Sequence, residues 1–178
     1  MMAADFEVRF HDGGADRTAH INVRPGLMEF LMEMQGRYQV VVFTTGRTPY
    51  AEAVLDELER RAGRQLFPLR RFSDACVVGR MAHDKTAAFK SLSFLGRHLG
   101  SVVFIDDSAE HWAFQKDNVI PVTTWTREKL PNDTELTQLV PLLHQLSEVA
   151  DVREELARRL GISVKVNATS RALLYTGT

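Results

Sequence analysis

The sequence predicts an α/β domain with a parallel sheet, and three features of its 178 residues point to that class. Short apolar runs such as "QVVVFTT" and "SVVFIDD" are typical of strands that are buried on both faces. These runs alternate with amphipathic segments of helical period, as in "PYAEAVLDELERRAG". Both runs end in polar residues, which are expected at the carboxyl ends of parallel strands, where such sheets collect ligands.

The N-terminal half begins with a strand pair. Alternation in Phe6–Phe10 and in "TAHINV" predicts two strands, joined by the turn-forming stretch "HDGGAD". Pro25 suits the first position of a helix that Gly36 ends, and Arg24 before it is placed to pair with an acid. A buried strand over Gln39–Thr45 and the charged helix "PYAEAVLDELERRAG" follow.

The C-terminal half has shorter elements. Strand-like pieces are expected around Leu66–Phe72 and Ala75–Val78, and a helix from about Ser91 to Leu99. A short strand follows "AFQKDN". The stretch "DTELTQLVPLLHQLSEVADVREELARRLG" is helical, with Pro141 as a kink or a boundary.

Composition limits what the chain can do. With 44% hydrophobic residues it can bury one core, so we expect one domain over residues 1–160 and a C-terminal tail over 161–178. The formal net charge of −1 argues against nucleic-acid binding and against a basic membrane anchor. One cysteine allows neither an internal disulfide nor a cysteine-based zinc site. No apolar stretch reaches the roughly 18 residues of a membrane span, so we expect a soluble, intracellular protein.

Asp106 and Asp107 are candidate functional residues. Two adjacent carboxylates after a buried strand repel each other and are costly to bury. A cation, a lysine or both would offset that cost. The alternative is a turn or a helix cap, where aspartate is common. Taken alone, Thr44 is an ordinary β-branched strand residue, and Lys90 is an ordinary solvated lysine.

Four stretches, in order, resemble the phosphatase domain of the small C-terminal-domain phosphatases, which act on the RNA polymerase II tail and belong to the haloacid dehalogenase superfamily. They are "VRPGLMEFL", "VVVFTTGRTPYAEAVLDEL", "FKSLSFLGRHLGSVVFIDDSAEHWAFQKDNVIPV" and "DTELTQLVPLLHQLSEVADVREEL". The resemblance implies a haloacid-dehalogenase-like (Rossmann-like) parallel sheet with flanking helices and a small β insertion. The same domain occurs in a subunit of the mitochondrial presequence translocase, where it mainly binds proteins.

The resemblance also implies site residues. Thr44 matches the threonine that holds a phosphoryl oxygen, and Lys90 matches the lysine that neutralises the phosphoryl group. Asp106 and Asp107 match the acidic pair that completes a Mg²⁺ site, although the second position is often Asn in the small phosphatases. Mg²⁺ prefers oxygen ligands, and a lysine and a hydroxyl beside it stabilise the charged oxygens of phosphoryl transfer.

Substrate binding departs from the family pattern. Ser73 stands where the small phosphatases have an arginine that grips the substrate peptide, and Arg70 or Arg71 is the nearest substitute. Both are therefore candidate substrate-binding residues. The segment "VVGRMAHDKTAAFK" is longer than its counterpart, which would reshape that side of the pocket, so specificity for the polymerase tail is not implied.

The family's nucleophile is missing from the chain. It lies in an Asp-x-Asp-x-Thr motif on the first strand, where the first Asp forms an aspartyl-phosphate and the second is the general acid and base. The chain contains no Asp-x-Asp, and Asp12 and Asp16 have the wrong spacing. Without that central strand, the neighbouring strand edges must pair directly, accept another strand such as "ISVKV", or join an upstream segment.

Two functions follow from this sequence. The first is a Mg²⁺-dependent phosphoserine/phosphothreonine phosphatase domain, inactive as given because its nucleophile is absent. The second is a non-catalytic protein-binding module like the import translocase subunit. Either would have a phosphoprotein or another protein as its partner, and an exposed sheet edge would favour a homo-oligomer. The compartment stays open, with nucleus or cytoplasm favoured over the mitochondrion.

Overall fold

The computed structural model describes residues 3–80, 86–108 and 114–160. The chain forms two compact units. The first comprises Met1–Ala75 and Thr123–Glu148, and the second comprises Cys76–Val122 and Val149–Thr178. None of the described helices is long and apolar enough to cross a membrane.

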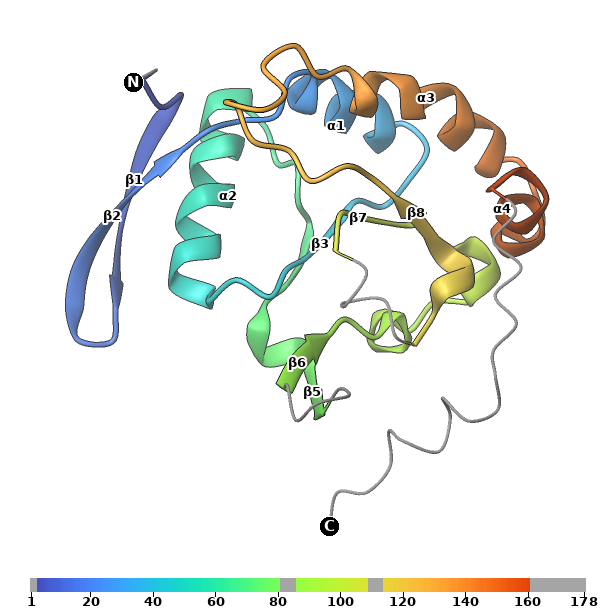
Figure 1. The fold of residues 1–178 in the computed structure, drawn as a ribbon, viewed down its shortest axis with the longest axis horizontal. Coiled ribbons are helices and arrows are strands. Elements are labelled where there is room, and N and C mark those ends of the chain that lie inside the picture. Colours follow the sequence, from blue (N-terminus) through green and yellow to red (C-terminus); the bar gives the residue numbers. More distant parts are fainter. Residues whose placement is uncertain (1–2, 81–85, 109–113, 161–178) are drawn as a thin grey trace. The chain divides into compact units, whose positions relative to one another are not determined.

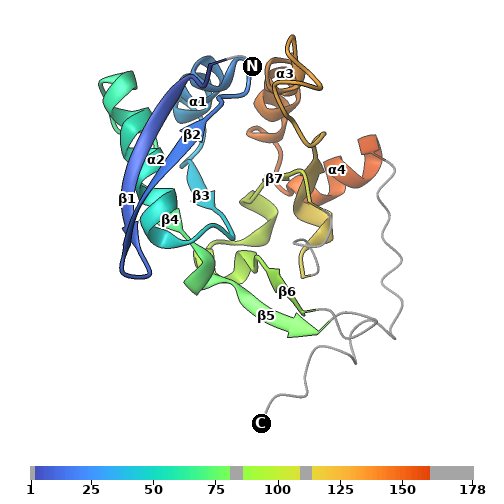
Figure 2. The ribbon, with the colours of Figure 1, turned by 60° about the vertical axis from the view of Figure 1, so that its left-hand side comes forward.

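The first unit opens with a β-hairpin, which confirms the two predicted strands. Strands β1 (Phe6–Asp12) and β2 (Ala15–Ile21) are antiparallel, with Asp12 opposite Ala15. Gly13 and Gly14 between them have φ angles of 62° and 79°, as a tight two-residue turn with the twist of the strands requires. The hairpin lies alongside α2 (Thr48–Ala62) in Figures 1 and 2.

Helix α1 (Leu27–Gln35) ends at Gly36, as predicted, but it does not begin at Pro25. Pro25 lies in a turn with Gly26, whose φ of 76° is left-handed, so the helix starts two residues later than the proline pattern indicated. Strands β3 (Val41–Phe43) and β4 (Leu69–Arg71) pair in parallel.

Helix α3 (Glu135–Leu146) completes the first unit and packs against α1. Pro141 lies inside this helix, so it is not a boundary. The Tyr38 hydroxyl donates to the Leu143 carbonyl at 2.6 Å, which joins the chain after α1 to α3.

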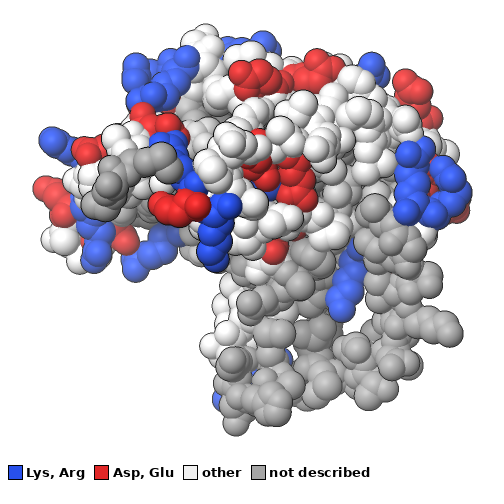
Figure 3. Space-filling view, turned by 45° about the horizontal axis from the view of Figure 1, so that its top comes forward, with Lys and Arg blue, Asp and Glu red and all other residues white. Residues whose placement is uncertain are grey.

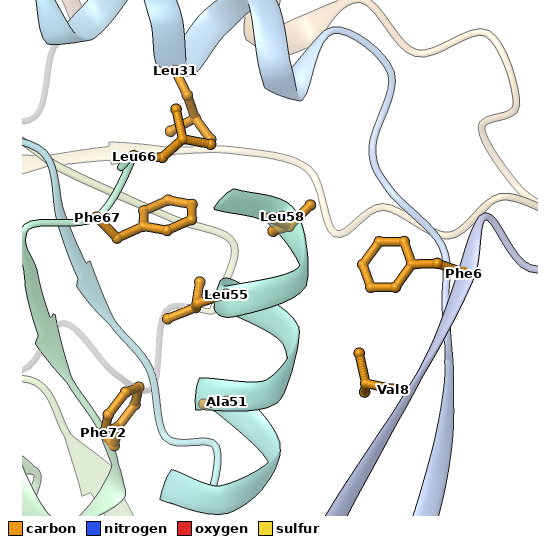
Figure 4. Packing of buried hydrophobic residues seen from close by; sticks show 9 residues of the cluster. All are labelled: Phe6, Val8, Leu31, Ala51, Leu55, Leu58, Leu66, Phe67 and Phe72. Carbon is orange, nitrogen blue, oxygen red and sulfur yellow. The ribbon is translucent and has the colours of Figure 1, made fainter. Parts of the chain in front are cut away.

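The core of the first unit surrounds α2. Figure 4 shows side chains on both sides of this helix: Leu55 points toward Phe67, and Leu58 points toward Phe6 of the hairpin. Leu66 is completely buried. The apolar stripe that the sequence places on α2 is therefore shared between the hairpin and the segment that leads into β4.

Within its described residues, the second unit contains two small sheets and one α-helix. Its elements are β5 (Val77–Arg80) antiparallel to β6 (Thr86–Phe89), β7 (Phe104–Asp106) parallel to β8 (Val119–Pro121), and α4 (Val152–Leu160). The predicted helix from Ser91 to Leu99 is wrong. Two short 3₁₀ turns, Leu92–Leu95 and Leu99–Ser101, take its place, because Gly96 ends the first turn with a left-handed φ of 62°.

Each sheet within the described residues has two strands, so β3 pairs only with β4 there and β7 only with β8. The alternative in which the two apolar strands pair directly stays a prediction, because β3 and β7 belong to different units. No strand within the described ranges takes the place of the family's first strand. The stretch "ISVKV" and the predicted tail over 161–178 lie outside the described residues.

Candidate functional site

The predicted lysine and the first predicted aspartate meet in the second unit. Lys90 directly follows β6, and Asp106 is the last residue of β7. Both residues are 8% exposed, and the Lys90 Nζ forms an ion pair with the Asp106 Oδ2. Because either charge would be costly to bury alone, each side chain makes the other's burial possible.

Asp106 is held by further contacts. Its Oδ1 accepts a hydrogen bond from the Ser108 backbone N–H at 2.8 Å, and its carbonyl accepts one from the Val122 N–H at 3.2 Å. The Lys90 Nζ also lies 5.5 Å from the centre of the Phe104 ring. Asp106 therefore makes the turn contact that its position after a strand favours and is paired with a buried cation as well.

The exposed Asp107 follows immediately. Asp106 and Asp107 both offer only carboxylate oxygens, the ligand type that suits Mg²⁺, because this ion keeps several waters and needs few protein ligands. No group of three or more His, Cys, Asp or Glu side chains with metal-binding geometry occurs in the described part of the chain. The residues present therefore fit a hydrated Mg²⁺ better than a zinc site closed by protein ligands.

Thr44 lies in the first unit, directly after β3, in the tight connection to α2. Its N–H donates to the Arg71 carbonyl at 2.9 Å, and its Oγ1 accepts from the Gly46 N–H at 3.0 Å. The Gly46 carbonyl accepts from the Ser73 N–H at 3.2 Å. The loop thus fixes Thr44 at the carboxyl end of a parallel strand, as the sequence predicts.

Arg70 is engaged within the first unit. Its guanidinium donates to Asp56 at 2.6 Å and to Glu59 at 2.7 Å, so it fastens β4 to α2. Arg71 donates from its side chain to the Arg70 carbonyl at 3.3 Å. A substrate-binding role for either arginine stays a prediction, and for Arg70 it would require exchange of these carboxylate partners.

The predicted pairing of Arg24 with an acid is confirmed. Arg24 donates to Asp133 at 2.8 Å, to Glu135 at 2.6 Å and to the Thr123 carbonyl at 3.0 Å. The hydrogen bond from Arg24 holds the pKa of Asp133 below its ordinary value of 3.8. The network joins the segment before α1 to the segment before α3, so its role is architectural.

One contact close to Thr44 was not singled out from the sequence. Arg47, the residue that precedes α2, forms an ion pair with Asp12 at the end of β1, with 2.8 Å between the Arg47 Nη2 and the Asp12 Oδ1. The only sign of this contact in the sequence was an arginine in the connection that follows the polar residues at the end of β3. Its acidic partner is 35 residues away, and only folding brings the two together.

Acidic and basic side chains are intermixed on the face drawn in Figure 3. This agrees with the near-zero net charge and gives that face no single sign. The features that characterise the chain are therefore the α/β elements and the buried lysine–aspartate pair at a strand end.

The comparisons name the family. The model of the NLI interacting factor-like phosphatases matches residues 1–153, and the chain belongs to that family. It is 35% identical over 149 residues to the human "Carboxy-terminal domain RNA polymerase II polypeptide A small phosphatase 1", covering 84% of this chain and 53% of that protein. It is 32% identical over 148 residues to "CTD small phosphatase-like protein 1" of Caenorhabditis elegans, covering 83% and 28%.

Solved structures give the same fold. Fcp1, described as an essential RNA polymerase II CTD phosphatase, matches with a TM-score of 0.53 and 20% identity, over 96% of this chain and 46% of that one. The fold is haloacid-dehalogenase-like, as the sequence predicts. The chain spans between 28% and 53% of the length of the relatives compared, a C. elegans, a fission yeast, a human and a fly protein.

Proposed function

We propose that this chain is a Mg²⁺-dependent, phosphoprotein-binding domain of the phosphoserine/phosphothreonine phosphatase type, and that its 178 residues alone do not catalyse hydrolysis. The observation that carries the proposal is the buried Lys90–Asp106 ion pair at the end of β7, in a chain of a phosphatase family. A paired lysine and carboxylate at such a strand end suit a phosphate ester and its metal ion.

Each residue has a role in this proposal. Asp106 and Asp107 would hold Mg²⁺, which when bound supplies positive charge to the phosphoryl oxygens. Lys90 would orient Asp106 and balance its charge, and the Thr44 hydroxyl would donate to a phosphoryl oxygen. Without the attacking carboxylate of an Asp-x-Asp-x-Thr motif, these groups bind the ester but offer no covalent path.

Binding of a fluorescent phosphoserine peptide, followed by anisotropy, tests the proposal. We expect binding that requires Mg²⁺, is lost in EDTA, and is weakened at least tenfold by Asp106→Asn, because one charge-assisted contact to the metal site is worth more than 1.4 kcal/mol. Asp117→Asn, an exposed acid of the same unit, is the matched control and should bind like the parent chain.

Phosphate release measured on the same samples should stay at the background rate. Mg²⁺-dependent release that Asp106→Ala abolishes would contradict the proposed lack of turnover. Equal affinity for the phosphorylated and unphosphorylated peptides would contradict phosphate recognition. That second result would favour the other candidate, a non-catalytic protein-binding module, for which the absence of any Asp-x-Asp is the supporting observation.

A further inference from the structure

We propose that Arg47, anchored by Asp12 and assisted by Arg17, selects phosphopeptides that carry an acidic side chain two or three residues from the phosphorylated one. The inference rests on the proposed function and adds a specificity-determining residue to it. All the residues involved belong to the first unit.

Asp12 is the anchor of this arrangement. It closes the hairpin turn, and its side chain is only 11% exposed although it lies at the end of a two-stranded sheet. Its carboxylate binds the Arg47 Nη2 at 2.8 Å, and its backbone carbonyl accepts from the Arg17 Nε at 3.4 Å. A largely buried carboxylate thus fixes the position of one arginine, and its backbone contacts a second.

Positive charges outnumber negative ones in this cluster, so a negatively charged ligand group can bind to it. The Arg47 guanidinium pairs with the Asp12 carboxylate, whereas Arg17 contacts the Asp12 backbone carbonyl, so the two arginines and one aspartate together carry a net charge of +1. The Arg47 side chain is 71% exposed, and Arg17 is exposed as well. A guanidinium has five N–H donors in a fixed fork, and Asp12 engages one of them at hydrogen-bond distance on Arg47, so a carboxylate can bind the outward side.

The surroundings form a recognition surface beside Thr44. Phe10 lies opposite Arg17 in the hairpin and packs edge-to-face on Tyr50 of α2, with 5.6 Å between the ring centres. A Cβ atom on Gly46 would lie 3.2 Å from the Thr44 Oγ1 and 3.7 Å from the Tyr50 Cδ1. The aromatic pair therefore lies near Thr44 and offers apolar surface to a peptide that places its phosphate there.

The separation of Thr44 and Arg47 determines which residue of the peptide Arg47 contacts. Arg47 is three residues from Thr44, so their Cα atoms lie at most about 11 Å apart. An extended peptide advances about 3.3 Å per residue, so the arginine side chain reaches a group two or three residues from the phosphorylated one. A carboxylate there would meet the cationic cluster, whereas an amide of the same shape would lack the charge.

The test uses fluorescent phosphoserine peptides that carry a single glutamate at each position from −3 to +3, with glutamine at the same place as the reference. Anisotropy is measured with Mg²⁺ on the parent chain, on Arg47→Gln, and on Arg60→Gln, whose exposed arginine lies near the other end of α2. We expect one position at which glutamate binds about fivefold more tightly than glutamine. This ratio should fall to about one in Arg47→Gln and persist in Arg60→Gln.

The outcomes separate the two proposals. If phosphopeptides bind but the glutamate-to-glutamine ratio is about one at every position, the inference is overturned and the proposed function stands. A preference for glutamate that persists in Arg47→Gln also overturns it. If no phosphopeptide binds in the presence of Mg²⁺, the proposed function fails, and the inference fails with it.

Discussion

Lys90→Met is expected to lower the free energy of unfolding by about 3 kcal/mol or more, because it leaves the Asp106 carboxylate buried without its cation. Methionine keeps most of the apolar stem, so the loss reflects charge rather than volume. The same change should abolish Mg²⁺-dependent phosphopeptide binding if the pair belongs to a phosphate site. Denaturant unfolding followed by circular dichroism gives the first quantity, and peptide anisotropy gives the second.

Lys116→Met is the matched control, since Lys116 is an exposed lysine of the same unit, and its replacement should change the unfolding free energy by less than about 0.5 kcal/mol. Adding Asp106→Asn to Lys90→Met should restore part of the lost stability, because the unpaired buried charge is removed. Equal stability of the two lysine variants would show that the Lys90–Asp106 contact does not compensate for burial of the carboxylate.

Arg24→Met is expected to cost about 3 kcal/mol at neutral pH, because Asp133 and Glu135 lose the cation that they share. The Arg24 side chain is 13% exposed and that of Asp133 is 8% exposed, so solvent screens the pair only weakly. The control is Arg37→Met. Arg37 is 40% exposed and lies 3.8 Å from Glu148, so its replacement should cost under about 1 kcal/mol.

The cost of Arg24→Met should depend on pH. Arg24 lowers the pKa of Asp133 in the folded chain, so this stabilisation is fully present above the ordinary value of 3.8 and is lost as pH falls through the lowered value. The gap in melting temperature between the parent chain and Arg24→Met should therefore be constant near neutral pH and should narrow below about pH 4. A gap that is unchanged at pH 3 would show that packing rather than charge holds this contact.

Local signals predicted most of the secondary structure. The turn glycines Gly13 and Gly14, the helix-ending Gly36 and Gly63, and the alternation in Phe6–Phe10 each act over a few residues, so the sequence suffices to predict them. The prediction of a helix from Ser91 to Leu99 was wrong, because it also relied on a local signal. Its apolar spacing allowed a helix, but Gly96 favours a left-handed conformation that ends the turn.

Some features of the candidate site could likewise be predicted from local sequence, and others depend on contacts between residues that are remote in sequence. The positions of Thr44 and Asp106 at strand ends follow from apolar runs that can be read in the sequence. The ion pair between Lys90 and Asp106 was expected only through the family resemblance, because spacing alone does not fix which lysine reaches a strand end. The partners of Arg70, Asp56 and Glu59, were not foreseen, since they depend on how β4 packs on α2.

The sequence by itself determined the α/β class, the turns, the strand ends that carry polar groups, and the absence of an Asp-x-Asp among these 178 residues. Only the tertiary structure decided which charges form pairs: Lys90 with Asp106, Arg24 with Asp133, and Arg47 with Asp12. The physical reason is that backbone geometry responds to neighbouring residues, whereas the burial of a charge depends on partners that are remote in sequence.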